Sequence, residues 1–130
     1  MNIMVGYNGG EVGERALKLA RDYALLTNAF VHVITSMEGG DSEKPSDIVQ
    51  AEKDLEFARK FMEDAGVKFL AHQSVRGLSP GEDIVLYAKE NDIDHIFVGI
   101  KKKSRTQKMI LGSTARFVIL KAHCAVTSIK

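Results

Sequence analysis

The chain has a single cysteine, Cys124, among its 130 residues. One thiol excludes an internal disulfide framework and is typical of proteins in a reducing cytosol. No apolar run approaches the roughly 20 residues that cross a bilayer, and the N-terminus lacks the basic and then apolar pattern of a signal peptide. We therefore expect a cytoplasmic protein that does not associate with membranes.

An excess of one charge is also missing, since 18 basic and 17 acidic residues leave a net charge of +1. A nearly neutral chain has no general attraction to nucleic acid, so we expect no nucleic-acid partner. The fractions of hydrophobic residues, 45%, and of charged residues, 27%, are those of an ordinary globular protein. The length predicts one domain, over residues 1–130.

Several motifs that would indicate a particular chemistry are absent. The four histidines are isolated from one another, without the spacing of metal ligands, and no Ser–His–Asp or Cys–His arrangement can be argued. Residues 6–11 do not match the dinucleotide pattern Gly-x-Gly-x-x-Gly, and no Gly-Lys-Ser/Thr of a P-loop exists. The segment after residue 5 also lacks the Ser and Thr of an FMN loop. We therefore assign no catalytic residue and no metal ligand.

Strand and helix signals alternate along the chain. Runs rich in apolar and β-branched residues predict strands at residues 3–5, 30–35, 67–75, 93–98 and 125–129. Apolar residues three and four positions apart predict helices over about residues 16–27, 46–65, 79–90 and 113–122. This order predicts an open, parallel α/β sheet with helices on both faces.

The local signals for helix starts differ in strength. In Ser79-Pro80-Gly81-Glu82, the serine is a predicted N-cap, the proline occupies the first helical position and the glutamate closes a capping box. Ser46 is the predicted cap of the preceding helix. The Gly-, Ser- and charge-rich segment at about residues 37–46 is predicted to be a mobile loop.

A candidate binding site follows from the predicted sheet, because ligands bind beyond the carboxyl ends of the strands where the winding reverses. Asn8 and Gly99 both follow strands at that edge, and Gly112-Ser113 begins the last helix. A helix start offers free N–H groups to a phosphate, and a glycine there removes the Cβ that would block it. The alternatives are a simple turn at Gly112, an N-cap at Ser113 and a solvated basic loop that contains Lys101, Lys102, Lys103, Arg105 and Lys108.

These motifs together resemble a universal stress protein domain along nearly the whole chain. That family has an apolar first strand ending in a short turn, a Leu-His-Val-like second strand, a glycine-containing turn before the third helix, and Gly-x2-Gly-x9-Gly-Ser. Here those places hold Ile3-Met4-Val5-Gly6-Tyr7-Asn8-Gly9, Val31-His32-Val33, Arg76-Gly77-Leu78-Ser79-Pro80, and Gly99-Ile100-Lys101-Lys102 with Gly112-Ser113.

The resemblance implies a Rossmann-like fold, similar to the adenine nucleotide alpha hydrolases, with strand order 3-2-1-4-5. It implies a homodimer through the C-terminal edge strand, Ala125–Ile129. In one branch it also implies bound ATP, or ADP or AMP, which can carry Mg²⁺. The implied function is a regulatory module in a stress response, with slow ATP hydrolysis at most. The predicted nucleotide-binding residues are Gly6, Tyr7, Asn8, Val33, Val98, Gly99, Lys102, Gly112, Ser113 and Thr114.

Two departures from the family pattern put ATP binding in question. Lys102 replaces the second motif glycine, and Asn8 replaces the acidic residue after the first strand. Members without the glycine motif do not hold ATP. This chain keeps the first glycine, the spacing and the final Gly-Ser, so a nucleotide-free dimer that acts as an interaction protein is the alternative, and a true hydrolase is a third.

Overall fold

The structure of the chain is a computed structural model, and it describes residues 1–37, 39, 43–100 and 111–130. Strands and helices alternate along the described chain. In order they are β1 (Asn2–Gly6), α1 (Gly10–Thr27), β2 (Phe30–Met37), α2 (Pro45–Asp64), β3 (Phe69–Val75), α3 (Pro80–Glu90), β4 (His95–Gly99), α4 (Ser113–Lys121) and β5 (Ala125–Ile129).

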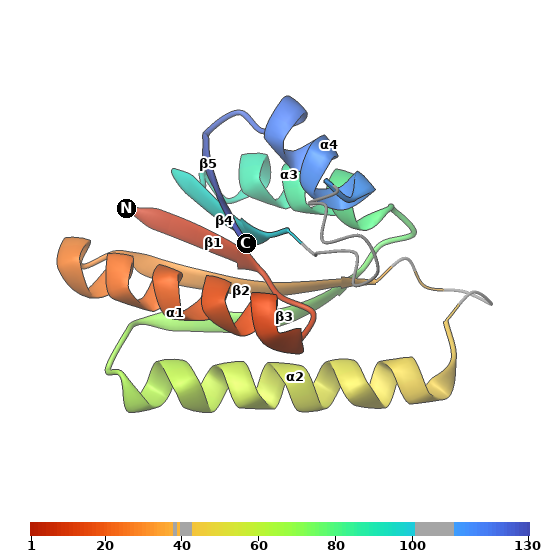
Figure 1. Cartoon of the computed structure of the whole chain (residues 1–130), viewed down its shortest axis with the longest axis horizontal. Helices are drawn as coiled ribbons and strands as arrows, with labels where there is room; N and C mark the ends of the chain where they lie inside the picture. Colours follow the sequence, from red (N-terminus) through yellow and green to blue (C-terminus); the bar gives the residue numbers. More distant parts are fainter. Residues whose placement is uncertain (38, 40–42, 101–110) are drawn as a thin grey trace.

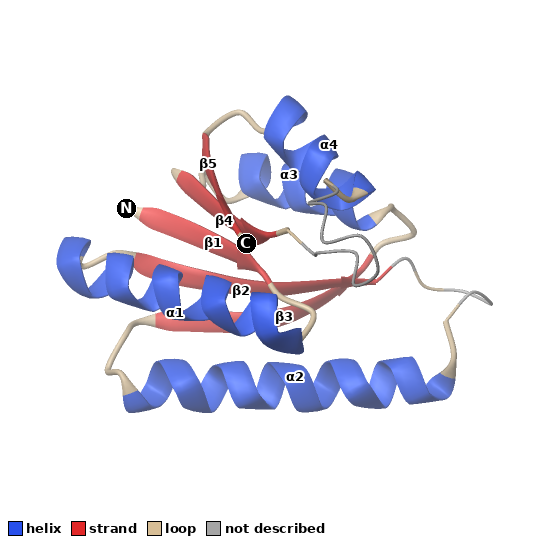
Figure 2. Ribbon diagram, viewed as in Figure 1, coloured by secondary structure: helices blue, strands red, loops and turns tan. Residues whose placement is uncertain are grey.

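The strands form one parallel sheet with the order β3-β2-β1-β4-β5, which confirms the predicted fold class and strand order. Helices α1 and α2 cover one face of this sheet, and α3 and α4 cover the other (Figure 1). The layers are also clear when the ribbon is coloured by element type (Figure 2). The winding direction reverses between β1 and β4, so the carboxyl ends of these two neighbouring strands open a crevice between them.

The central strand explains why the core has two halves. Ile3, Met4 and Val5 are all fully buried, but successive side chains of a strand point to opposite faces. Ile3 and Val5 pack in the cluster under α1 and α2, whereas Met4 packs in the cluster under α3 and α4. A strand covered on both faces has no polar side, which is why it appears in the sequence as a continuous apolar run.

The predicted cap of α2 was wrong by two residues. Lys44 is the N-cap, Pro45 is the first helical residue, and Ser46 therefore lies inside the helix. Proline suits this first position because its φ is already helical, and the Asp47 carboxylate accepts the Lys44 N–H at 3.1 Å. β2 extends to Met37, so the predicted loop at 37–46 is shorter at both ends, and residues 38 and 40–42 lie outside the described part of the chain.

Ser79 and Pro80 occupy the N-cap and first positions of α3, as predicted, but the capping box prediction was wrong in its hydrogen bonds. The Ser79 hydroxyl donates to the Glu82 carboxylate at 2.7 Å instead of accepting a backbone N–H. Two predicted strand starts were also too early. The N–H groups of Val67 and Ile93 donate to the last turns of α2 and α3, so these residues end helices and cannot join the sheet ladder.

None of the helices in the described part of the chain is long and apolar enough to cross a membrane.

Candidate functional site

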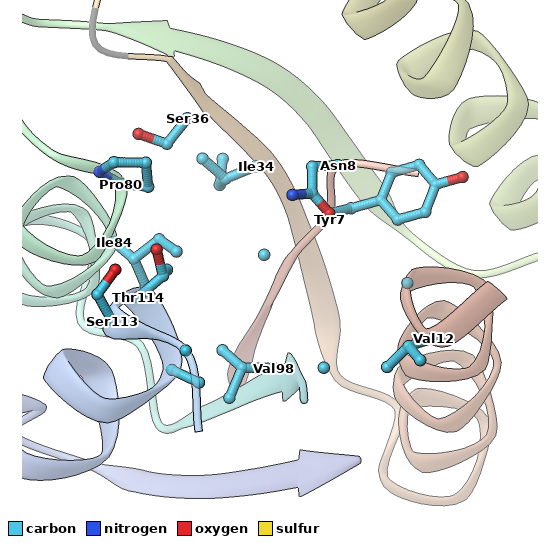
Figure 3. A pocket seen from close by; sticks show the side chains of 15 residues that line it. Tyr7, Asn8, Val12, Ile34, Ser36, Pro80, Ile84, Val98, Ser113 and Thr114 are labelled. Carbon is cyan, nitrogen blue, oxygen red and sulfur yellow. The ribbon is translucent and has the colours of Figure 1, made fainter. Parts of the chain in front are cut away.

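A cavity of about 280 Å³ lies at the carboxyl edge of the sheet, where β1 and β4 end and α4 begins. Segments far apart in the sequence converge on it, as the close view in Figure 3 shows. The lining residues are Gly6, Tyr7, Asn8, Val12, Gly13, Ile34, Ser36, Pro80, Ile84, Val98, Gly99, Gly112, Ser113, Thr114 and Ala115. Its volume is close to the lower end of the roughly 300–1,000 Å³ typical of small-molecule sites.

The structure brings together eight of the ten residues that the sequence predicted for a nucleotide site. They are Gly6, Tyr7, Asn8, Val98, Gly99, Gly112, Ser113 and Thr114. Val33, which is predicted to contribute only its backbone, is not among the lining residues, and its side chain is fully buried in the core under α1 and α2. Its neighbour Ile34, on the opposite face of β2, lines the cavity instead. Lys102 lies outside the described residues.

Tyr7 lines the cavity, but its phenol ring points away from it (Figure 3). Burial, with smaller contributions from the charges of Asp54 and Glu14, raises the pKa of the Tyr7 phenol to about 12. The Tyr7 N–H donates to the Ile34 carbonyl at 2.9 Å, and its carbonyl accepts the Thr35 hydroxyl at 2.6 Å. Tyr7 therefore fixes the end of β1 against β2, and its backbone, not its phenol, faces the cavity.

The start of α4 provides the features that a phosphate requires. Gly112 is the N-cap, and among the described residues no side chain makes a capping hydrogen bond to this helix. Its φ of −63° and ψ of 161° are open to any residue, and a Cβ built there would meet no atom of the described residues within 4 Å. The next three residues, 113–115, line the cavity, so the N–H groups of the first turn and the positive end of the helix dipole are close to it.

Gly99, at the end of β4, is required by close packing. A Cβ built on Gly99 would lie only 2.6 Å from Cγ1 of Val12 in the first turns of α1, which is far closer than carbon atoms approach. Both residues line the cavity. The glycine therefore lets α1 lie directly against the end of β4 and sets how wide the cavity is at this point.

A buried carboxylate lies next to the cavity, and sequence analysis missed it. Asp83 in α3 is 0% exposed. Its Oδ2 accepts the Ser36 hydroxyl at 2.5 Å, and its Oδ1 accepts Nε of Arg76 at 2.7 Å. Burial alone would raise the pKa of Asp83, but hydrogen bonds from Ser36, Ser74 and Arg76, with the guanidinium charge, together lower it. Arg76 in turn donates to Glu90 at 2.6 Å.

Sequence analysis also missed further lining residues, which are Val12, Gly13, Ile34, Ser36, Pro80, Ile84 and Ala115. Ile34 and Ser36 are two positions apart on β2 and so lie on the same face, but the predicted strand ended at residue 35 and therefore left Ser36 out. Pro80 and Ile84 are one helical turn apart in α3, but no local signal shows that this turn faces β2. In the described ranges, no group of three His, Cys, Asp or Glu side chains is placed to hold a metal ion.

The family model described as "Universal stress protein family" matches residues 1–130. A universal stress protein of Archaeoglobus fulgidus has a similar structure, with a TM-score of 0.90, 38% identity, and coverage of 99% of this chain and 97% of that one. A universal stress protein from the same organism, solved in complex with dAMP, is 34% identical with a TM-score of 0.83, over 99% of this chain and 96% of that one. Universal stress protein MJ0531 of Methanocaldococcus jannaschii is 29% identical, over 98% of this chain and 81% of its own length.

Proposed function

This chain belongs to the universal stress protein family, and on that premise we propose that it is an adenine-nucleotide-binding regulatory module that acts in a stress response. The observation that carries the proposal is the junction of the cavity with the start of α4. There the lining of the cavity, which has both apolar and polar residues, meets the first turn of α4. This turn has a glycine as its N-cap and no side-chain cap from the described part of the chain. The dAMP complex of the 34% identical relative supports the same ligand class.

The cavity favours one orientation of the nucleotide. The phosphate nearest the sugar lies at the first turn of α4, where the helix dipole and the free N–H groups attract an anion. The base then lies toward β2 and the start of α3, where Ile34, Pro80 and Ile84 present apolar surface. ATP is the proposed ligand, with ADP and AMP as alternatives. No acidic cluster is placed for Mg²⁺ in the described residues, so in this proposal the ion accompanies the phosphates of ATP.

The proposal includes a cytoplasmic homodimer that pairs through β5. Within the described sheet β5 hydrogen-bonds only to β4, so its other edge is open to a second strand. Hydrolysis is at most slow in this proposal, since the described lining contains no histidine, lysine or carboxylate to act as a base.

The competing function is a nucleotide-free dimer that acts through protein contacts. It is favoured by the two departures from the family pattern, Lys102 and Asn8. Asn8 lines the cavity, and its side-chain amide can donate hydrogen bonds as well as accept them, whereas a carboxylate at this position would only accept them. Lys102 lies outside the described residues.

One variant tests the proposed function directly. Gly112→Val should abolish binding of ATP, ADP and AMP in calorimetry, because its side chain occupies the approach to the α4 start. The fold should be unchanged, since the Gly112 backbone angles suit valine and a Cβ there has no close neighbour in residues 1–37, 39, 43–100 and 111–130. Lys121→Val, exposed at the other end of the same helix, is the matched control and should bind as the wild type does.

The ultraviolet spectrum of the purified, denatured protein gives a second measurement. A chain without tryptophan absorbs weakly near 260 nm, so co-purified adenine is readily seen. If no such absorbance is present and none of the three nucleotides binds at millimolar concentration, the nucleotide-free function replaces the proposed one.

A further inference from the structure

We propose that the open edge of β3, together with a hollow beside it, is a docking site for an extended basic segment of a partner protein. The segment pairs with β3 as one further strand and places a lysine or arginine side chain in the hollow. This surface shares no lining residue with the nucleotide cavity and lies at the opposite edge of the sheet from β5. The inference therefore depends neither on the proposed nucleotide nor on the proposed dimer.

The outer side of β3 presents backbone groups for pairing. β3 is the outermost strand of the described sheet, and it hydrogen-bonds there only to β2 (Figure 1). The Val31 N–H donates to the Lys68 carbonyl at 3.0 Å, so residue 68 and every second residue after it direct their backbone groups to β2. The backbone groups of Phe69, Ala71 and Gln73 therefore face outward. Such a row of donors and acceptors is a template for a strand from another chain.

One face of β3 is covered and the other is open. Phe69 and Ala71 pack against the core cluster under α1 and α2. Leu70 and His72 point to the opposite face, where both side chains are exposed. A strand added to β3 would bring its own side chains beside Leu70 and His72. Pairing would then bury apolar surface as well as satisfy backbone groups.

A hollow of about 560 Å³ lies beside the second half of β3. Residues 72–76 line it, together with Tyr87, Glu90 and Asn91 from the end of α3. Neighbouring residues of a strand point to opposite faces, so a hollow that is lined by consecutive strand residues includes the edge of the strand itself. A segment that pairs with this edge therefore passes over the hollow, and the end of α3 forms the wall next to its side chains.

The hollow carries an excess of negative charge. Arg76 is the one arginine or lysine in its described lining. The Nε of Arg76 donates to Oδ1 of Asp83 at 2.7 Å, and its Nη1 donates to Oε1 of Glu90 at 2.6 Å. Two carboxylates thus share one guanidinium, and the last turn of α3 adds the negative end of its helix dipole. A cationic side chain is the group that complements this charge.

Glu90 is the residue that would contact the cation. Its side chain is 50% exposed, and a carboxylate with one oxygen bound to Arg76 retains a second oxygen that accepts a hydrogen bond. Asp83 is 0% exposed, so it contributes charge without touching the partner. The hollow therefore favours lysine or arginine over a neutral or acidic side chain.

Arg59 in α2 restricts which segments can pair with this edge. Its Nη2 donates to the outward carbonyl of Ala71 at 3.3 Å, and its Nη1 donates to Glu56 at 3.2 Å. A partner strand that pairs at Ala71 must displace the first of these hydrogen bonds, and a charge at a sheet edge discourages unspecific pairing. Arg59 thus weakens the binding of every segment, and the negative hollow restores it for a basic one.

Fluorescence anisotropy with labelled peptides tests the docking on the full chain. The probe is the peptide Thr-Val-Lys-Val-Thr with blocked ends, and its control carries glutamate in place of lysine. The lysine peptide should bind about tenfold or more tightly than the glutamate peptide, because a hydrogen bond to a charged group replaces a repulsion. The difference should shrink at high salt. Equal affinity of the two peptides, or no binding of the lysine peptide at millimolar concentration, would overturn the inference.

Two N-methylated forms of the lysine peptide test for strand pairing. One carries N-methyl groups on its odd residues and the other on its even residues. Alternate N–H groups of a strand point to opposite sides, so one form should lose binding and the other should keep it. If both forms bind as the unmodified peptide does, the hollow recognises an amine without a strand, and the inference is overturned.

Charge variants test the two residues that set the preference. Glu90→Gln should remove most of the difference between the lysine and glutamate peptides, while Glu52→Gln, an exposed residue of α2 outside the hollow, should keep it. Arg59→Gln should tighten binding severalfold because it frees the Ala71 carbonyl. Lys60→Gln removes the same charge from the next, exposed position and should have a smaller effect. A purely structural role of Glu90 would leave the ratio of the two affinities unchanged.

Three further variants locate the binding edge. Ala71→Pro removes an outward N–H and should abolish peptide binding. Val126→Pro at the β5 edge and Gly112→Val at the nucleotide cavity should both bind the lysine peptide as the wild type does. Loss of binding in Val126→Pro would place the peptide on β5 and overturn the inference, whereas the nucleotide measurements are unaffected by either result. If Ala71→Pro does not fold, the two N-methylated peptides decide alone.

Discussion

Single residues set the size of the cavity, and Gly99 is the clearest case. Its missing Cβ leaves room for the Val12 side chain at the junction of β4 and α1. Valine in a helix has essentially one χ1 rotamer, so it cannot turn away from an added methyl group. The identity of residue 99 is therefore decided by a contact with a residue 87 positions earlier in the chain.

Gly99→Ala should lower the free energy of unfolding by about 1–3 kcal/mol, because the added methyl group overpacks the contact with Val12. It should also weaken nucleotide binding, since both residues line the cavity. Urea denaturation gives the first quantity and calorimetry the second. Combining Gly99→Ala with Val12→Ala should recover part of the lost stability. A Gly99→Ala protein as stable as the wild type would show that α1 moves freely at this junction.

Single residues also explain why the ring of Tyr7 does not face the cavity. Tyr7 lies at the carboxyl edge of β1, yet its ring is buried beside Asp54 and away from the cavity. The glycines that follow it, Gly9 and Gly10, have φ of 79° and 80°, which few other residues adopt. This turn directs the chain from β1 into α1 and leaves Asn8 as the polar side chain at the cavity.

At the scale of elements, β5 is an edge strand, and the direction of its backbone groups determines where a strand of a second chain can pair with the sheet. Ile129 accepts the N–H of Ile100, so its polar backbone groups point toward β4. Backbone groups alternate sides along a strand, and those of Val126 therefore point away from β4, toward the open edge. This orientation makes Val126 a residue at which pairing with a second chain can be tested without breaking the sheet.

Val126→Pro should convert the proposed dimer to monomer, because proline removes an outward-facing N–H and is tolerated only at such positions. The β4–β5 pairing should survive, so the circular dichroism spectrum should change little. Light scattering at micromolar concentration measures the mass, and Val126→Thr, which keeps the N–H, is the control. A wild-type protein that is monomeric under these conditions would contradict the proposed assembly.

At the scale of the whole molecule, buried ionisable groups make stability depend on pH. The pKa of Asp83 is lowered in the folded state, so the unfolded chain binds this proton at higher pH than the folded chain does. Burial lowers the pKa values of His32 and His95, so these also take up protons more readily after unfolding. In each case unfolding takes up protons, and acid favours the unfolded state.

The free energy of unfolding should therefore fall in two stages as the pH decreases. The first stage begins near the ordinary histidine pKa of 6.5, and the second begins near the ordinary aspartate pKa of 3.8. Urea denaturation at pH 7.5, 5.5 and 3.5 would measure both. His32→Gln should reduce the first stage and Asp83→Asn the second, although each variant is less stable at pH 7.5. Equal pH dependence in wild type and variants would refute this assignment.

The sequence by itself determined the order of the elements and the class of the sheet. Apolar strands and helical apolar spacing depend on neighbours a few residues away, and this local information was sufficient for the parallel sheet and for exact limits of β5. The glycine and serine at the α4 start were also visible, because helix starts have local chemistry. Ser46 was wrongly predicted as a cap because Pro45, one residue earlier, is equally suited to begin a helix.

Only the tertiary structure decided which face of each element meets the cavity. Ser36 and Asp83 are 47 residues apart and meet because α3 crosses over β2. In the sequence Asp83 is one acidic residue in a first helical turn, where solvent exposure is the rule. Whether a carboxylate is buried, and therefore which way a neighbouring hydroxyl donates, depends on partners such as Arg76 that only folding brings together. Local periodicity carries no information on such long-range pairs.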